Sequence, residues 1–370
     1  MENKNESSLK LDFIDSLRGY AILAVLMVHA SQNGQPLNSD LGNTILIKGA
    51  RGVQLFFMAS AITLFYSYYK RRNNEPFKIR SFFIRRFFRI APMFYIAIVY
   101  YLFQKLHEGN NLFDLKHLPD ILAAFTFSLS THPYWVSAII PGGWSVSVEV
   151  IFYFLLPILY LKIKNIQQAF NLFLIAIIVR VLLQQFFQAY PLINDPNYWN
   201  SFLIYYFPNQ FPVFAIGIFL YFLIFEKKMI VLKNPFTIFL LMMILFFQMA
   251  SAYDIFIPEN ISFSALLGCF IWYLSEFKNS ILVNPIINFI GRISFSIYVV
   301  HFAIFYWLNH YEILDLFRNT YINYVFKFLI VSLISIIISI FFYYFIEVPF
   351  QKMGAKIIGR IKYPVSETLN

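Results

Sequence analysis

The sequence predicts an all-α protein: a polytopic membrane helical bundle of about ten transmembrane helices plus a re-entrant segment, with both termini in the cytosol. The 370 residues are 59% hydrophobic and only 13% charged, and the mean hydropathy is +0.63. Soluble domains contain about 45–50% apolar and about 25% charged residues. The apolar residues fall into runs that approach the ~20 residues a spanning helix needs, and Lys and Arg gather between the runs. This composition excludes a soluble enzyme, a nucleic-acid-binding protein and a disulfide-rich secreted domain.

The apolar runs define the candidate spans. They fall at about 19–30, 52–69, 90–103, 119–131, 144–161, 166–188, 201–225, 236–252, 261–275, 293–308 and 322–346. If every run crossed the membrane, Lys162 and Lys164 would lie outside and every later basic loop would be inverted, against the positive-inside rule. The run at 119–131 is short and carries Asp120. We therefore expect it to enter the membrane without crossing, which leaves ten spans.

Two ionisable residues lie in the first run. Arg18 and His29 are eleven residues apart, which places them on one helix face and ~16 Å apart along the axis. A charged side chain inside a span costs at least ~2.5–3.5 kcal/mol, so it is a functional candidate by default. The alternative is an Arg that extends to the membrane surface and a His that is satisfied by a neighbouring helix.

A polar stripe marks the fifth run. Ser145, Glu149 and Tyr153 recur every four residues on an otherwise apolar helix. Because this helix is expected to enter from the outer side, Glu149 would lie near the depth of His29. A carboxylate beside an imidazole fixes its tautomer and raises its basicity, as in general base catalysis. The alternative is a stripe that only joins helices.

A dense basic segment follows the second run, from Lys70 to Arg89, and holds Glu75 as its acid. Such a segment sets topology and contacts anionic lipid headgroups. A second interpretation is that its arginines bind the phosphates of an anionic cytosolic substrate. Near the tenth run, Arg292 is expected to enter from the cytosol, and Ser294, Tyr298 and His301 share one helix face. Taken separately, these residues are weak signals.

Motifs of soluble enzymes are missing from the sequence. It has no phosphate-binding glycine loop, no nucleophile elbow and no His or Cys pair with metal-ligand spacing, so we expect no metal. Its one cysteine, Cys269, lies in an apolar run and can form no disulfide within the chain.

Taken together, these segments resemble the acyltransferase-3 family, the multi-helix membrane acyltransferases that modify surface glycans. The matching blocks are Leu17-Arg18-Gly19 with His29, Gly52 to Ser60, Arg85-Arg86 with Arg89 and Pro92, Trp144 to Pro157, and Gly291 to His301 followed by Glu347 and Pro349. One departure is Ala61, which stands where the family usually has Gly.

The resemblance implies a membrane O-acyltransferase that uses acetyl-CoA from the cytosol as co-substrate, with no tightly bound cofactor. The acyl group would pass to a hydroxyl of a glycan or glycolipid at the outer side of the plasma membrane. The resemblance implies that His29 is the base or acyl carrier and that Glu149 orients it. It implies that the donor is bound by Arg18, Arg85, Arg86, Arg89 and Arg292. The residues implied for the pocket and the acceptor are Ser60, Trp144, Ser145, Ser147, Tyr153 and Tyr298. For His301 and Glu347 we favour structural roles.

The expected organisation is a single membrane domain over residues 1–362 with a short tail over 363–370. Some family members carry an extracytoplasmic hydrolase-like domain, which we do not expect here. Two alternatives stay open: a lipid or glycan transporter without chemistry, and an acyltransferase that uses succinyl or a longer acyl-CoA. Expected partners are acetyl-CoA, the acceptor and membrane lipid, with no nucleic acid. The sequence does not indicate the acceptor glycan or the oligomeric state.

Overall fold

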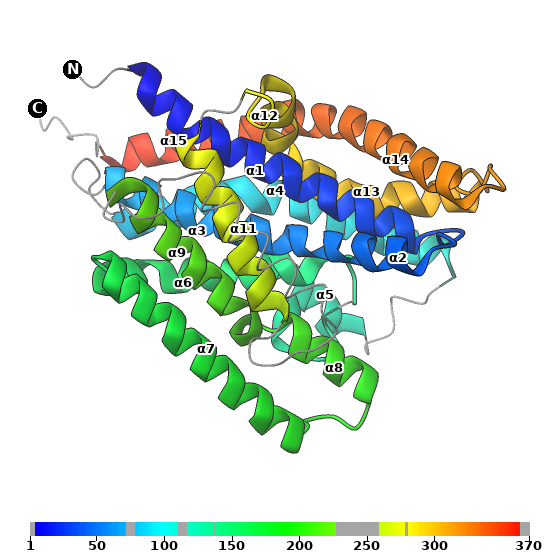
Figure 1. The fold of residues 1–370 in the computed structure, drawn as a ribbon, viewed down its shortest axis with the longest axis horizontal. Coiled ribbons are helices and arrows are strands. Elements are labelled where there is room, and N and C mark those ends of the chain that lie inside the picture. Colours follow the sequence, from blue (N-terminus) through cyan, green and yellow to red (C-terminus); the bar gives the residue numbers. More distant parts are fainter. Residues whose placement is uncertain are drawn as a thin grey trace, which may run out of the picture.

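The computed structural model describes residues 4–71, 78–109, 117–136, 138–226, 259–277 and 280–362, and within them the chain forms helices joined by turns (Figure 1). No strand occurs in these ranges, so the predicted all-α class is confirmed for them. A helix satisfies its backbone hydrogen bonds internally, which is why long apolar segments take this form in a bilayer.

Six helical stretches are long and apolar enough to cross a membrane, and a seventh is added if one bent helix pair counts as a span. The six are Asp12–Gln32, Asp40–Arg71, Gly143–Lys162, Ile166–Ala189, Pro196–Glu226 and Thr320–Ile361, and the bent pair is Pro285–Arg292 with Ser294–His310. The chain is therefore of the multi-pass membrane type. The expected count of ten is not confirmed: the runs at 90–103 and 261–275 are not among these stretches, and the run at 236–252 lies outside the described residues. The cytosolic placement of both termini stays a prediction.

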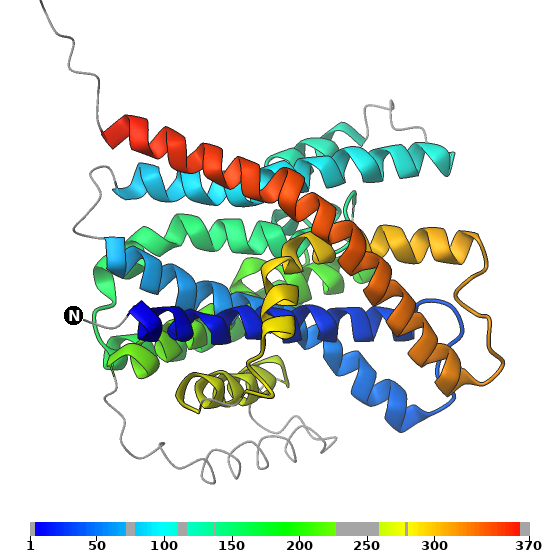
Figure 2. The same cartoon turned by 90° about the horizontal axis from the view of Figure 1, so that it is seen from above.

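Several helix ends lie at one end of the molecule (Figures 1 and 2). Here α1 (Lys4–Gln32) begins, α3 (Gly52–Arg71) ends, α4 (Lys78–His107) begins and α15 (Val348–Lys362) ends. Lys70 and Arg71 of α3 and the Lys and Arg residues in the first half of α4 gather at this end, which we call the basic end. At the opposite end lies α2 (Asp40–Ile47).

The remaining helices complete the bundle. Their bounds are α5 Leu118–Phe125, α6 Gly143–Lys162, α7 Ile166–Ala189, α8 Pro196–Tyr205, α9 Phe207–Glu226, α11 Glu259–Glu276, α12 Pro285–Arg292, α13 Ser294–His310 and α14 Thr320–Phe342. Large side chains such as Phe65, Phe152 and Phe214 are fully buried between these helices. By contrast, α7 leaves Ile178 and Leu182 exposed, as expected of a helix that faces lipid.

A close backbone contact fixes α12 against α1. A Cβ atom at Gly291 would overlap the backbone carbonyl of Asp15 and crowd the amide nitrogen of Gly19. Small residues allow helices in a membrane to approach in this way. Immediately after Gly291 the chain bends by 72° between α12 and α13. The contact therefore determines where α13 begins, and α13 carries several site residues.

The first turn of α6 lies inside the protein and not at its surface. The segment before it contains α5, whose eight residues extend only ~12 Å and are too short to cross a bilayer. This segment packs over the start of α6 through Leu129 and Ile140, both buried, and a Cβ at Gly143 would contact both side chains. As expected, the run at 119–131 does not form a spanning helix.

The last helical run joins the two ends of the molecule. It spans Thr320–Ile361 and contains a π-helical turn at Tyr343–Glu347. Glu347 in this turn is buried and accepts a hydrogen bond of 2.5 Å from Ser296 Oγ on α13. This bond fits the structural role expected for Glu347.

Candidate active site

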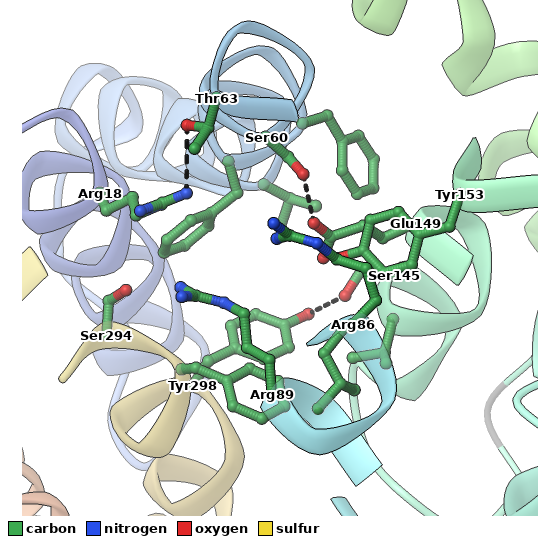
Figure 3. A pocket seen from close by; sticks show the side chains of 16 residues that line it. Arg18, Ser60, Thr63, Arg86, Arg89, Ser145, Glu149, Tyr153, Ser294 and Tyr298 are labelled. Atoms are coloured by element: carbon green, nitrogen blue, oxygen red, sulfur yellow. Dashed lines mark hydrogen bonds between the residues drawn. The ribbon is translucent and has the colours of Figure 1, made fainter. Parts of the chain in front are cut away.

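A polar pocket lies between α1, α3, α4, α6 and α13 (Figure 3). We call it the inner pocket. Its polar lining consists of Arg18, Ser60, Thr63, Arg86, Arg89, Ser145, Glu149, Tyr153, Ser294 and Tyr298, and the rest of its wall is apolar. The open space measures about 730 Å³, including the part that opens toward solvent. Three guanidinium groups face one carboxylate here, so the pocket favours an anionic ligand.

Arg18 reaches the pocket from α1. Its guanidinium donates a hydrogen bond to Thr63 Oγ1 at 3.3 Å, and it lies 3.6 Å from the carboxylate of Asp15 one turn earlier. Only 16% of the Arg18 side chain is exposed. A guanidinium that is this deeply buried must be paired or hydrogen-bonded. These contacts hold Arg18 in the bundle and leave it directed into the pocket, as Figure 3 shows.

Glu149 enters the same pocket from α6. Its carboxylate accepts a short hydrogen bond from Ser60 Oγ of α3. The Arg86 guanidinium lies over the Tyr153 ring, 5.9 Å from the ring centre, one turn along α6 from Glu149. Arg86 and Arg89 are three residues apart on α4 and therefore face the same way. The polar stripe of α6 and the arginines of α4 thus line one space.

The start of α6 is bonded to α13. The hydroxyl of Tyr298 donates to the Gly142 carbonyl at 3.0 Å and lies 2.8 Å from Ser145 Oγ. Gly142 has a φ of +74°, in the left-handed region that favours glycine. A Cβ atom at this position would lie 2.6 Å from the Tyr298 hydroxyl. The turn that aims Ser145 and Glu149 into the pocket therefore depends on this glycine.

A second, larger cavity opens at the basic end, and we call it the vestibule. It is lined by Thr63, Tyr66, Ser67, Lys70, Arg71, Arg85, Arg86, Arg89, Gln351 and Ala355, and its open space is about 1280 Å³. Thr63, Arg86 and Arg89 line both the vestibule and the inner pocket. The two cavities are therefore neighbours that share a wall of arginines.

His29 occupies a different place from Glu149. Its Nδ1 lies 3.0 Å from Gln32 Oε1, and its ring packs against Phe302 and His301, with centroid distances of 4.4 and 5.3 Å. None of these three contacts involves the residues that line the inner pocket. The expected His29–Glu149 pair is not formed. The buried side chains of Leu129 and Ile140 cover the start of α6, so this helix does not begin at the protein surface, as the expected depth of Glu149 assumed.

Three further expected site residues do not line the inner pocket. Arg292 is exposed, packs over the Phe289 ring and lines neither cavity, since it ends α12 before the bend. Ser147 is fully buried and hydrogen-bonds the backbone amide and hydroxyl of Ser130 at 3.0 and 2.8 Å. Trp144 stacks on Tyr205 at 4.3 Å, outside the pocket wall. These last two side chains hold α6 against its neighbours.

Sequence reasoning missed the residues of α3 that complete the cavities. Thr63 binds Arg18, and Ser67 lines the vestibule one turn further along. Together with Ser60 they form a polar stripe at three- and four-residue spacing on an apolar helix. That stripe was visible in the sequence and is of the same kind as the one on α6.

Comparison with known proteins gives the family of the chain. The family model described as an acyltransferase domain matches residues 11–344. The chain belongs to the acyltransferase-3 family. Provisionally named O-acetyltransferases of Staphylococcus aureus, from strains COL and N315 among others, are 26% identical to it over 379 residues, or 94% of this chain and 58% of each relative.

A more distant relative is the acyltransferase MdmB of Streptomyces mycarofaciens, 28% identical over 167 residues, which cover 43% of this chain and 41% of MdmB. The chain spans about 58% of the length of the staphylococcal proteins described above. No solved structure shows a significant match to it.

Proposed function

We propose that this acyltransferase-3 protein transfers an acetyl group from acetyl-CoA to a hydroxyl of a cell-surface glycan or glycolipid. Family membership gives the reaction class, and the staphylococcal relatives carry the name O-acetyltransferase. The observation that carries the choice of donor is the arginine wall shared by the vestibule and the inner pocket.

The vestibule suits the phosphate-bearing part of the donor. Arginine binds phosphate oxygens through two parallel hydrogen bonds, and such charge-assisted bonds are about twice as strong as neutral ones. Arg85 and Lys70 line the vestibule but not the inner pocket, whereas Arg86 and Arg89 line both cavities. A donor held by its phosphates at this wall would direct its pantetheine arm into the inner pocket and its thioester past Tyr298 toward His29.

His29 supplies the base in this proposal. It lies eleven residues beyond Arg18 on α1, or ~16 Å toward the opposite end. Its Nε2 takes the proton of the acceptor hydroxyl while the hydroxyl oxygen attacks the thioester carbonyl. The carbon–sulfur bond breaks, and the proton passes to the departing thiolate, giving the O-acetyl ester and free CoA. The donor enters from the basic end, which the positive-inside rule assigns to the cytosol, and the acceptor enters from the opposite side.

Glu149 balances the charge of the arginines in this proposal and does not pair with His29. Without a carboxylate, Arg18, Arg86 and Arg89 would repel one another in a buried space. Glu149, held by Ser60, offsets part of that charge and leaves a net positive pocket for the donor.

Binding of acetyl-CoA to the detergent-solubilised protein tests the proposal. A ligand that binds only the folded state raises the melting temperature. We expect acetyl-CoA and CoA to raise Tm at micromolar concentrations, and pantetheine, which lacks the phosphates, to raise it much less. An unchanged Tm with acetyl-CoA, in a sample that melts cooperatively, would contradict the proposed donor.

A further inference from the structure

His301 is the second histidine beside His29. It lies on α13, is fully buried, and its ring centre is 5.3 Å from that of His29, a separation at which facing ring nitrogens can reach hydrogen-bond distance. Tyr298, one turn earlier on the same helix, lines the inner pocket, and its ring lies 5.7 Å from that of His301. His301 therefore stands between the wall of the pocket and His29.

The hydrogen bonds of His301 define its tautomer. Its Nδ1 lies 2.7 Å from the backbone carbonyl of Tyr298, and a carbonyl can only accept, so Nδ1 carries the proton. Nε2 then carries a lone pair. Among the described residues this buried atom has no hydrogen-bond partner. Buried polar atoms are nearly always paired, so this lone pair is available to a neighbouring donor.

His29 has the matching arrangement. Its Nδ1 donates to Gln32 Oε1, which leaves Nε2 as the free base. Two neighbouring imidazoles that both present lone pairs gain a hydrogen bond only when a proton lies between them. The neighbouring helix α14 packs on both α1 and α13. It carries the buried hydroxyls of Ser332, Ser335 and Ser339, which have no hydrogen-bond partner among the described residues.

We propose that His301 is a positioning residue for the transfer: once His29 Nε2 has taken the proton of the acceptor hydroxyl, that proton is shared in a three-centre hydrogen bond between the reacting oxygen and the lone pair of His301 Nε2. This inference rests on the proposed function and names the partner that stabilises the His29 imidazolium. The proton stays on His29 until it passes to the departing thiolate, so His301 forms no covalent bond and keeps its own Nδ1 proton. The nitrogen that a carboxylate holds in many hydrolases, Nδ1, is held here by Gln32, and His301 acts on the opposite nitrogen of His29.

The test compares acetyl transfer by the wild type with three variants. His301→Phe fills the site without a nitrogen, His301→Ala leaves it empty, and His310→Gln is the matched control, because His310 lies on the same helix and is exposed. We expect His301→Phe to lower kcat about 10- to 100-fold, with the KM for acetyl-CoA within about 3-fold of the wild type. Added imidazole should restore part of the activity of His301→Ala and none of His301→Phe, and His310→Gln should behave as wild type.

The inference is overturned if His301→Phe keeps the wild-type kcat. It is also overturned if both substitutions lower Tm and activity together and imidazole restores nothing, because that pattern describes a packing role. A folded wild type that shows no transfer overturns the proposed function and this inference with it. That outcome is distinguishable, since it is seen in the wild type before any variant is compared.

Discussion

Ser60 on α3 donates a hydrogen bond to the carboxylate of Glu149 on α6, and this bond closes a pocket that also holds Arg18 and Arg86. The two residues are far apart in the sequence and belong to different apolar helices. Their contact places the single acid of the pocket among its arginines. Donor binding is proposed to depend on this balance of charge in the pocket.

The arginines shared by the two cavities should control use of the donor. Arg86→Ala or Arg89→Ala removes hydrogen bonds to phosphate, each worth about 1.5–3 kcal/mol, so the KM for acetyl-CoA should rise about 10- to 100-fold. The KM for the acceptor should change less than about 3-fold. Arg80→Ala is the matched control, since Arg80 lies on the same helix, is exposed and lines neither cavity. Equal effects of all three substitutions would show that general charge, and not this wall, attracts the donor.

Glu149→Gln should destabilise the empty protein and make it more dependent on the donor. The amide still accepts a bond from Ser60 but no longer offsets the buried guanidinium charges. We expect Tm without ligand to fall by several degrees, and acetyl-CoA to raise Tm by more in this variant than in the wild type. Ser60→Ala, which keeps the carboxylate, should show a smaller fall. A variant that melts like the wild type with and without donor would refute the charge-balancing role.

Gly142→Ala should disturb the start of α6 through both strain and a clash. Gly109 is a suitable control, because its φ is also positive, +83°, while a Cβ there would meet nothing within 4 Å. Both substitutions carry the cost of a left-handed alanine, about 1 kcal/mol or more. Only Gly142→Ala also pushes against the Tyr298 hydroxyl. Thermal melting should therefore show a larger loss for Gly142→Ala, accompanied by lower transfer activity. Equal losses would mean that the turn tolerates the added methyl group.

Arg292→Ala should leave donor use nearly unchanged, although the family resemblance suggested a donor role. Exposed substitutions away from a site usually change stability by less than about 0.5 kcal/mol, and Arg292 lines neither cavity. We expect the KM for acetyl-CoA to stay within about 2-fold of the wild type in the same assay. A 10-fold rise would place Arg292 at the donor after all.

The helical class and most pocket residues were predictable, because an ionisable residue in an apolar run must face protein or water. Arg18 and Glu149 were identified by that argument and Arg86 by its dense basic segment, and the structure brings the three together. The depth of each residue was not predictable from helix spacing alone. Glu149 was assigned to His29 on the assumption that α6 starts at the membrane surface, whereas the 118–142 segment covers its first turn.

The role of side chains near a helix end was also beyond sequence reasoning. Arg292 and Ser294 are two residues apart, yet only Ser294 lines the inner pocket. The 72° bend between α12 and α13 separates them, and that bend depends on the tertiary contact of Gly291 with α1. Similarly, the proximity of His29 and His301 follows from the packing of α1 on α13, which no local pattern specifies.

The most direct test of the central claim is transfer of labelled acetyl from acetyl-CoA to a total cell-envelope glycan extract, with wild type beside His29→Gln. The account predicts label on the glycan with the wild type only, at least about 100-fold above the variant, while acetyl-CoA raises the Tm of both proteins equally. Transfer by His29→Gln at the wild-type rate would contradict the assignment of His29 as the base. A folded wild type that moves no label to glycan would contradict the proposed reaction itself.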